Sequence, residues 1–76
     1  MATERKQITE TTTINYVVTM QNVTHGYIYY NTTGDNNVAN CFILKPFERV
    51  DMPGSSVTVV YTGEHAEVVV ELSPQK

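Results

Sequence analysis

Two histidines, one cysteine and two adjacent serines are the residues of this sequence that could carry catalytic chemistry: His25, His65, Cys41, Ser55 and Ser56. Nucleophilic catalysis needs a nucleophile within hydrogen-bond reach of a base, a third group that orients the base, and a cleft. The two serines stand beside a Pro-Gly pair, and the cysteine stands in an apolar stretch. A chain of 76 residues has little room to build a cleft around any of them. We therefore expect a protein that is not an enzyme and that uses no cofactor.

The same residues could instead bind a metal ion, with His25 and His65 joined by Cys41 or Glu64. The sequence has no C-x-x-C or H-x-x-x-H spacing, so such ligands would have to converge through the fold alone. The loop 34–37 lacks the repeating acidic ligands of a calcium site. We expect no metal site and two exposed turn histidines. Cys41 is expected to be a small buried hydrophobe, with a bridge to a second chain as the alternative.

Three tyrosines cluster in the run GYIYYN, at positions 27, 29 and 30. On a strand, Tyr27 and Tyr29 would share one face, and Tyr30 would lie with Ile28 on the other. Paired aromatic rings can stack on bases or sugars, but tyrosine also suits protein interfaces because it buries a rigid ring and keeps a hydroxyl group. We expect core packing first, a protein interface second, and binding of sugars or bases last.

Charge and hydropathy exclude several classes of partner. The net charge is −3, and the five basic residues are scattered, whereas a phosphate backbone requires a concentrated basic stripe. No apolar run approaches the roughly 20 residues of a membrane helix, and the N-terminus has no signal-peptide core. We expect no nucleic acid and no membrane as partner, no secretion signal, and a location in a virion or the cytoplasm. Asn22 and Asn31 head formal glycosylation sequons, which we interpret as turn chemistry.

Alternating apolar residues and regularly spaced turn residues predict an all-β protein. Residues 1–13 are expected to form an extended N-terminal arm that can become a strand where a sheet edge is available, and residues 14–76 a single small domain. Five to six strands at roughly ten-residue spacing are typical of a small antiparallel sandwich or barrel, immunoglobulin-like in general architecture. The expected strands before the last hairpin are 14–20, 27–31, 38–45 and a short edge strand at 47–52.

A C-terminal hairpin is the element that the pattern predicts most sharply. A two-residue loop at Gly63 and Glu64 would pair Val57 with Val70, and Val59 with Val68, on one apolar face. A shift by one residue would move glutamates into that face. A turn at 53–55, with proline and glycine, is expected to precede the first strand of this hairpin.

The strand at 38–45 carries apolar residues on both faces, which favours a position covered on both sides. The segment 47–59 resembles the late strands of immunoglobulin-like sandwiches in having an apolar residue, a short spacer, Pro-Gly-Ser-Ser and alternating valines. That pattern is common to many β-domains and assigns no family.

The remaining classes of function are binding and assembly. A domain of this size buries only about 60% of its unfolded surface, so burial against a partner would stabilise it. We expect a structural protein that docks on or builds a larger repetitive assembly, such as a virus or phage capsid decoration or a minor virion protein, with itself or a larger scaffold as partner. The expected interface residues are Ile8, Tyr27, Tyr29, Tyr30, Val60 and Val69.

The alternative is a small soluble binding module or inhibitor that presents an acidic face of Glu64, Glu67, Glu71 or Asp35 to another protein. A carbohydrate-binding adhesin that uses Tyr27 and Tyr29 is the third possibility.

Overall fold

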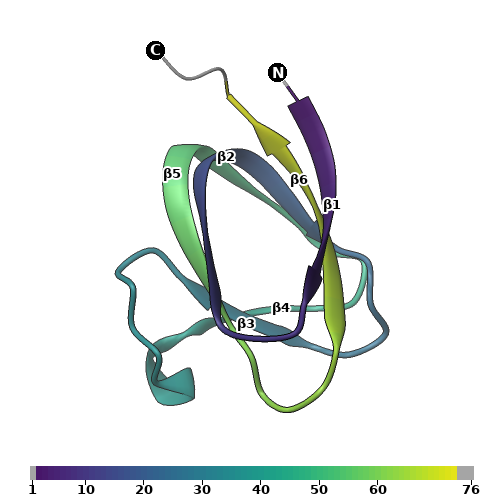
Figure 1. Cartoon of the computed structure of the whole chain (residues 1–76), viewed down its shortest axis with the longest axis vertical. Helices are drawn as coiled ribbons and strands as arrows, with labels where there is room; N and C mark the ends of the chain where they lie inside the picture. The colour runs from purple at the N-terminus through teal and green to yellow at the C-terminus, as the bar shows by residue number, and fades with distance from the viewer. Residues whose placement is uncertain (1, 74–76) are drawn as a thin grey trace.

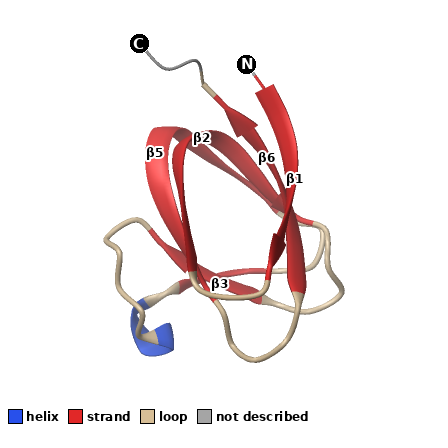
Figure 2. Ribbon diagram, in the orientation of Figure 1, coloured by secondary structure: helices blue, strands red, loops and turns tan. Residues whose placement is uncertain are grey.

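A computed structural model of the chain describes residues 2–73, which form six β-strands and one short 3-10 turn (Figures 1 and 2). Every strand pair is antiparallel, so the expected all-β class is confirmed. No helix within the described part of the chain is long and apolar enough to cross a membrane. The elements are β1 (Ala2–Ile8), β2 (Thr12–Asn22), β3 (Ile28–Asn31), η1 (Val38–Asn40), β4 (Phe42–Leu44), β5 (Arg49–Val60) and β6 (Ala66–Leu72).

All six strands belong to one curled sheet in the order β1-β6-β2-β5-β3-β4 (Figure 1). β2 lies in the middle and is hydrogen-bonded to β5 on one edge and to β6 on the other. β1 and β4 are the two ends of this order, and each pairs with a single neighbour among the described residues. The sheet therefore has two edges, and their side chains differ in character.

The predicted C-terminal hairpin is wrong in its pairing. β5 and β6 follow each other in the chain, but β2 lies between them in the sheet. The connection between them spans residues 61–65, longer than the predicted two-residue turn. The central β2 bonds to both valine-rich strands, so its backbone groups are paired on both of its edges.

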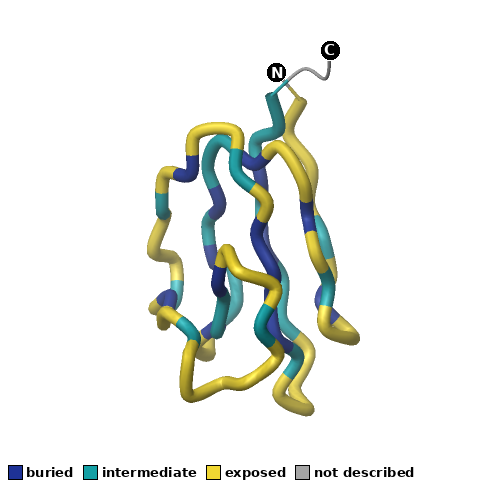
Figure 3. Tube along the Cα trace, turned by 90° about the vertical axis from the view of Figure 1, so that its left-hand side faces the viewer, coloured by how far each residue is buried: buried dark blue, intermediate teal, exposed yellow. Residues whose placement is uncertain are grey.

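The inward direction of the valines is nevertheless as predicted. Val57, Val59, Val68 and Val70 all lie in the core with at most 1% of their surface exposed. Alternation fixes which side of a strand faces the core, and this holds whichever strand is the neighbour. Figure 3 shows how buried positions recur along the strands. The other buried members of the core cluster are Ile8, Ile14, Val17, Met20, Ile28, Leu44 and Met52.

The N-terminal arm contributes a strand to the fold of its own chain. Residues 2–8 pair with β6 along their whole length, from Ala2 opposite Leu72 to Ile8 opposite Ala66. Ile8 is 1% exposed and belongs to the core cluster. The arm therefore occupies an edge of its own sheet.

The turn predicted at 53–55 is a bulge within a continuous strand. β5 runs from Arg49 to Val60, and its register against β2 shifts on either side of Val17. Gly54 has a φ of 71°, a backbone conformation that glycine adopts without a steric penalty. Pro53 fits here because a bulge leaves a residue out of the regular ladder.

The predicted strand at 38–45 is much shorter than expected and is not covered on both sides. Val38–Asn40 form the turn η1, and Asn37 caps it by accepting a hydrogen bond from the Ala39 backbone N–H at 3.0 Å. β4 then includes only Phe42–Leu44, at the end of the sheet. Asparagine side chains compete for backbone groups in this way and interrupt extended structure.

Replacement of Ile8 by alanine should lower the free energy of unfolding by about 2–5 kcal/mol, because it removes a fully buried side chain that ties β1 to the core. Urea denaturation followed by circular dichroism measures this change. The matched control is Gln7→Ala, an exposed neighbour on the same strand, for which a change of at most about 0.5 kcal/mol is expected. An equally small effect of Ile8→Ala would show that β1 is dispensable for the fold.

Candidate protein-docking surface

The apolar edge strand β4 is the centre of the candidate site. Leu44 is 2% exposed and anchors the strand in the core, whereas Phe42 and Ile43 are 62% and 55% exposed. Successive residues of a strand point to opposite faces, so the two exposed side chains flank the edge on both sides. We call β4 with these two side chains the β4 edge.

The outer face beside this edge is also apolar. Tyr29 stands opposite Ile43 in the register of β3 and β4, so both lie on the same face. Tyr27, two residues earlier, is 61% exposed and lines a shallow hollow together with Tyr29 and with Val38 of η1. We call Tyr27, Tyr29, Val38 and Ile43 the outer apolar face. Glu64 at the rim of the hollow adds an acidic group.

Tyr30 lies on the opposite side of β3 from this surface. It stands opposite Phe42, and the ring centroids of the two residues are 5.7 Å apart at a tilt of 42°. Burial raises the pKa of the Tyr30 hydroxyl, and the negative charge of Glu48 adds to the effect. Tyr30 packs against the core cluster, so the tyrosine cluster divides into two outer residues and one inner residue.

The buried side chain of Asn22 holds the β4 edge in place. Its amide nitrogen lies 2.8 Å from the carbonyl oxygen of Gly26 and 3.1 Å from those of Leu44 and Lys45. Its Oδ1 accepts the backbone N–H of Thr24 at 2.9 Å. The backbone N–H of Asn22 donates to the carbonyl of Glu48 at 3.0 Å. One fully buried residue thereby joins the end of β2, the turn before β3 and both sides of the β4-β5 connection.

Asn31 organises the loop between β3 and β4 in the same manner. Its Oδ1 accepts the backbone N–H groups of Thr33 and Asp35 at 3.1 and 3.0 Å, and its amide donates to the Asp35 carbonyl and to the Cys41 sulfur. Cys41 is half-exposed and donates to the Asn37 carbonyl at 3.5 Å, so the prediction of a buried cysteine is wrong. Polar groups of the loop surround it, because η1 replaces the apolar strand that was expected there.

The interpretation of both sequons as turn chemistry is confirmed. In each sequon the asparagine Oδ1 accepts the backbone N–H of the residue two positions later, which is the geometry of an Asx turn. Asn22 is 0% exposed and Asn31 is 2% exposed. A glycan on either side chain is incompatible with this fold.

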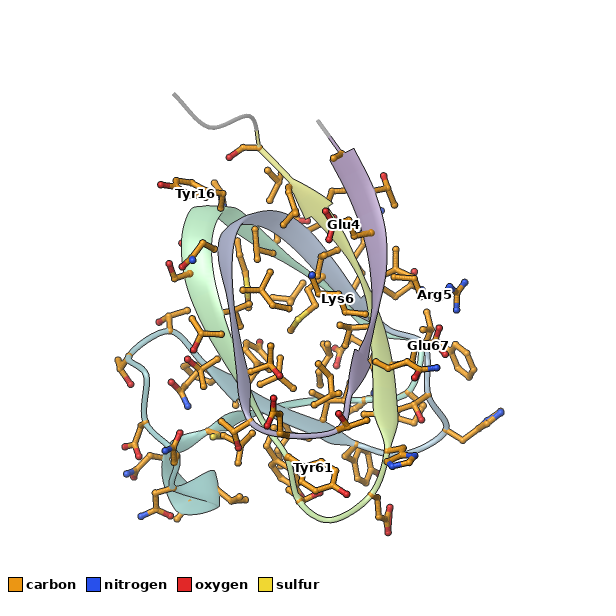
Figure 4. The ribbon with its side chains drawn as sticks, viewed as in Figure 1. Glu4, Arg5, Lys6, Tyr16, Tyr61 and Glu67 are labelled. Carbon is orange, nitrogen blue, oxygen red and sulfur yellow. The ribbon has the colours of Figure 1, made fainter. Side chains whose placement is uncertain are left out.

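Two exposed aromatic residues have a strained backbone. Tyr16 and Phe47 both have a φ of 63°, a region that bulky residues rarely adopt. Phe47 lies in the turn that leads from β4 to β5, where its carbonyl accepts a hydrogen bond from the Gln21 amide at 3.1 Å. Its ring and that of His25 form a T-shaped pair with centroids 5.5 Å apart. Such strain costs about 1–3 kcal/mol and clusters at functional positions. Tyr16 lies in the bulge of β2, apart from β4, as a comparison of Figure 4 with the strand labels of Figure 1 shows.

The other predicted interface residues occupy different positions. Ile8 and Val60 are buried, at 1% and 7% exposure, so neither is displayed by the folded chain. Val69 is half-buried in β6, opposite Arg5 of β1 and Gln21 of β2.

Both histidines line a hollow of about 300 Å³ together with Gln7, Thr24 and Glu67. Within residues 2–73 no three histidine, cysteine, aspartate or glutamate side chains are placed to hold a metal ion. Glu67 is held 2.8 Å from Arg5.

Phe42 and Ile43 are the surface residues that the sequence reasoning missed. Apolar alternation on both faces was interpreted as burial on both faces, although an exposed edge gives the same pattern. The available signal was the pair of breakers around them: an asparagine-rich loop before the strand and Pro46 after it leave room for only a short strand.

Replacement of Asn22 by alanine should lower the free energy of unfolding by about 2–4 kcal/mol, because a fully buried side chain is removed and one buried and three part-buried hydrogen bonds to the backbone are lost. Thermal and urea unfolding measure the loss. The exposed loop residue Asn36 provides the control, and Asn36→Ala should change stability by at most about 0.5 kcal/mol. If the two variants were equally stable, Asn22 would not hold the β4 edge.

Comparison of the chain with protein-family models, with curated proteins and with solved structures finds no match in any of the three.

Proposed function

We propose that this chain is a non-enzymatic structural protein that docks on or builds a larger repetitive assembly through its β4 edge and outer apolar face. The observation that carries the proposal is the exposure of Phe42 and Ile43 on a strand that ends the sheet. An edge strand offers unpaired backbone N–H and C=O groups, and an extended segment of a partner can bind to them as an added strand.

The contrast between the two edges of the sheet supports this assignment. β1 carries charged residues along its length, and Glu4 and Lys6 lie on its core-facing side, which disfavours pairing with an uncharged strand. β4 carries no charge between Phe42 and Leu44. A partner strand that pairs with β4 would bury Ile43 on the outer face and Phe42 on the inner face.

The aromatic residues beside the edge enlarge the docking surface. Tyr27 and Tyr29 supply large, rigid rings with few rotatable bonds, which lose little entropy on binding. The strained backbone of Phe47 in the adjoining turn supports a role in display, because the fold retains an unfavourable conformation there. The hollow lined by Tyr27, Tyr29 and Val38 is open to solvent, and a surface residue of a partner protein could enter it.

Size and composition support the kind of assembly that we propose. A small β-domain with a thin core gains stability when its apolar surface is covered by repeated neighbours. A virus or phage capsid decoration or a minor virion protein fits this description, with the virion or the cytoplasm as location.

Of the expected architectures, we propose a small, partly open barrel. Ile8, at the end of β1, lines a cavity of about 50 Å³ together with Val59 and Val60, at the end of β5. The curled sheet therefore brings these two strand ends to the same cavity. An immunoglobulin-like sandwich has two separate sheets, whereas the strands here share one.

The alternative, an inhibitor with an acidic face, has less support. Glu67 is paired with Arg5, and Glu71 accepts a hydrogen bond from Thr19 at 3.3 Å. Asp35 is engaged by Asn37 and Asn40, which hold the pKa of its carboxyl below the ordinary value. These acidic groups stabilise the fold locally.

Sedimentation of a native lysate through a density gradient tests the proposal. The wild-type chain should travel with large particles, at a fixed ratio to one major protein. Ile43→Lys should remain at the top of the gradient, because a desolvated charge on the β4 edge opposes docking, while its unfolding free energy changes by at most about 0.5 kcal/mol.

The matched control is Thr32→Lys, which places the same charge in an exposed loop and should sediment like the wild type. Wild-type protein that stays in the light fractions would contradict the proposed assembly. Co-sedimentation that Ile43→Lys leaves unchanged would show that β4 is not the docking edge.

A further inference from the structure

The second edge of the sheet has a charge pattern that fits another copy of itself. β1 is seven residues long and pairs only with β6 among the described strands, so its other edge is open. Figure 4 shows Glu4 and Lys6 on one side of this strand and Arg5, with Glu67, on the other. The Lys6 Nζ lies 3.0 Å from Glu4 Oε1, and the Arg5 guanidinium lies 2.8 Å from Glu67 Oε2.

We propose that β1 pairs in antiparallel fashion with β1 of a second copy, in a two-fold symmetric register centred on Arg5. The contact joins the two sheets into one continuous sheet. It uses the edge opposite to β4, so it stands or falls independently of the docking function proposed above.

Sheet geometry restricts the possible registers. Directly opposed residues point to the same side of an antiparallel sheet, so core-facing residues must oppose core-facing residues. A two-fold axis then places one residue opposite its own symmetry mate. The registers that overlap most of the strand are centred on Glu4, Arg5 or Lys6.

Charge selects one of these registers. Centring on Glu4 opposes two glutamates, and centring on Lys6 opposes two lysines, and like charges directly opposite each other are unfavourable. Centring on Arg5 places Glu4 opposite the Lys6 of the second copy at two symmetric positions. This register also brings two like charges together, the Arg5 side chains on the outer side, but each is paired with Glu67 at 2.8 Å, and the register gains two attractive Glu4-Lys6 contacts that the others lack.

Pairing of β1 with β4 of another copy is disfavoured when the charges of the two strands are compared. β4 has three residues and no charge, so it offers no partner to Glu4 or Lys6 and covers less than half of β1. The charged edge and the apolar edge therefore bind different partners, and the charged edge is self-complementary.

Charge-reversal variants test the contact by sedimentation velocity over a concentration series. The wild type should dimerise, and Glu4→Lys or Lys6→Glu alone should raise the dimer dissociation constant about tenfold or more, because attraction becomes repulsion at two positions. An equimolar mixture of the two variants should regain association as a heterodimer. The Glu4-Lys6 pair within each chain stays broken in that mixture, so recovery reports the contact between chains.

Disulfide trapping fixes the register. In a Cys41→Ser background, Arg5→Cys should form an intermolecular disulfide on mild oxidation, because opposed Cα atoms lie about 4.5–5.5 Å apart. Thr3→Cys lies on the same face and is the matched control. Its symmetry mate would be about 14 Å away, beyond disulfide reach. A monomeric wild type, a mixture that does not associate, or equal cross-linking of both cysteine variants would overturn the proposal.

Discussion

Two buried side-chain amides, those of Asn22 and Asn31, position the candidate docking surface of this protein. β4 is only three residues long, and such a strand holds its place poorly through ladder hydrogen bonds alone. Asn22 adds bonds to the carbonyl groups of Leu44 and Lys45, and its backbone bonds to Glu48 on the far side of the turn. Leu44 is buried, and its carbonyl group would lose this buried hydrogen bond without Asn22. The exposed Phe42 and Ile43 are thus held by polar contacts behind them.

In this arrangement, the residues that stabilise the fold differ from the apolar residues that are exposed at the surface. In a large domain, an apolar core usually fixes the loops, but a chain of 76 residues buries too little surface for that. Asparagines in the turns replace part of the core by bonding directly to the backbone. Within the described residues, every buried side-chain nitrogen and oxygen atom has a hydrogen-bond partner. Phe42 and Ile43 can then remain exposed at the surface, because polar contacts contribute to holding β4 in place.

The sequence reveals the faces of the strands better than their neighbours. Alternation places Val57, Val59, Val68 and Val70 on the core side, because side-chain direction is a local property of a strand. Pairing is not local: whether β5 bonds to β6 or to β2 depends on which arrangement satisfies the edges of all strands together. The sequons indicate where the chain turns, but not that their asparagines are buried at the ends of β2 and β3.

The candidate site is predictable from the sequence only in part, because exposure depends on strand order as well as on alternation. Tyr27 and Tyr29 are recognisable from the alternation, while the exposure of Phe42 and Ile43 follows from the position of β4 at the end of the sheet.

The two edges of the sheet also solve a problem that any open sheet has. An unprotected edge pairs with whatever strand it meets, so a protein with two open edges tends to polymerise without limit. Here one edge is charged and the other is apolar, so β1 and β4 do not match each other. Growth by repeated head-to-tail addition is disfavoured, because the charges of β1 would be buried against the apolar residues of β4 without partners. The two proposed contacts do not repeat without limit, because the contact at β1 is symmetric and the contact at β4 is made with a different strand. Under the two proposed contacts, the chain pairs with one other copy at β1 and with a different partner at β4, and open-ended polymerisation is disfavoured.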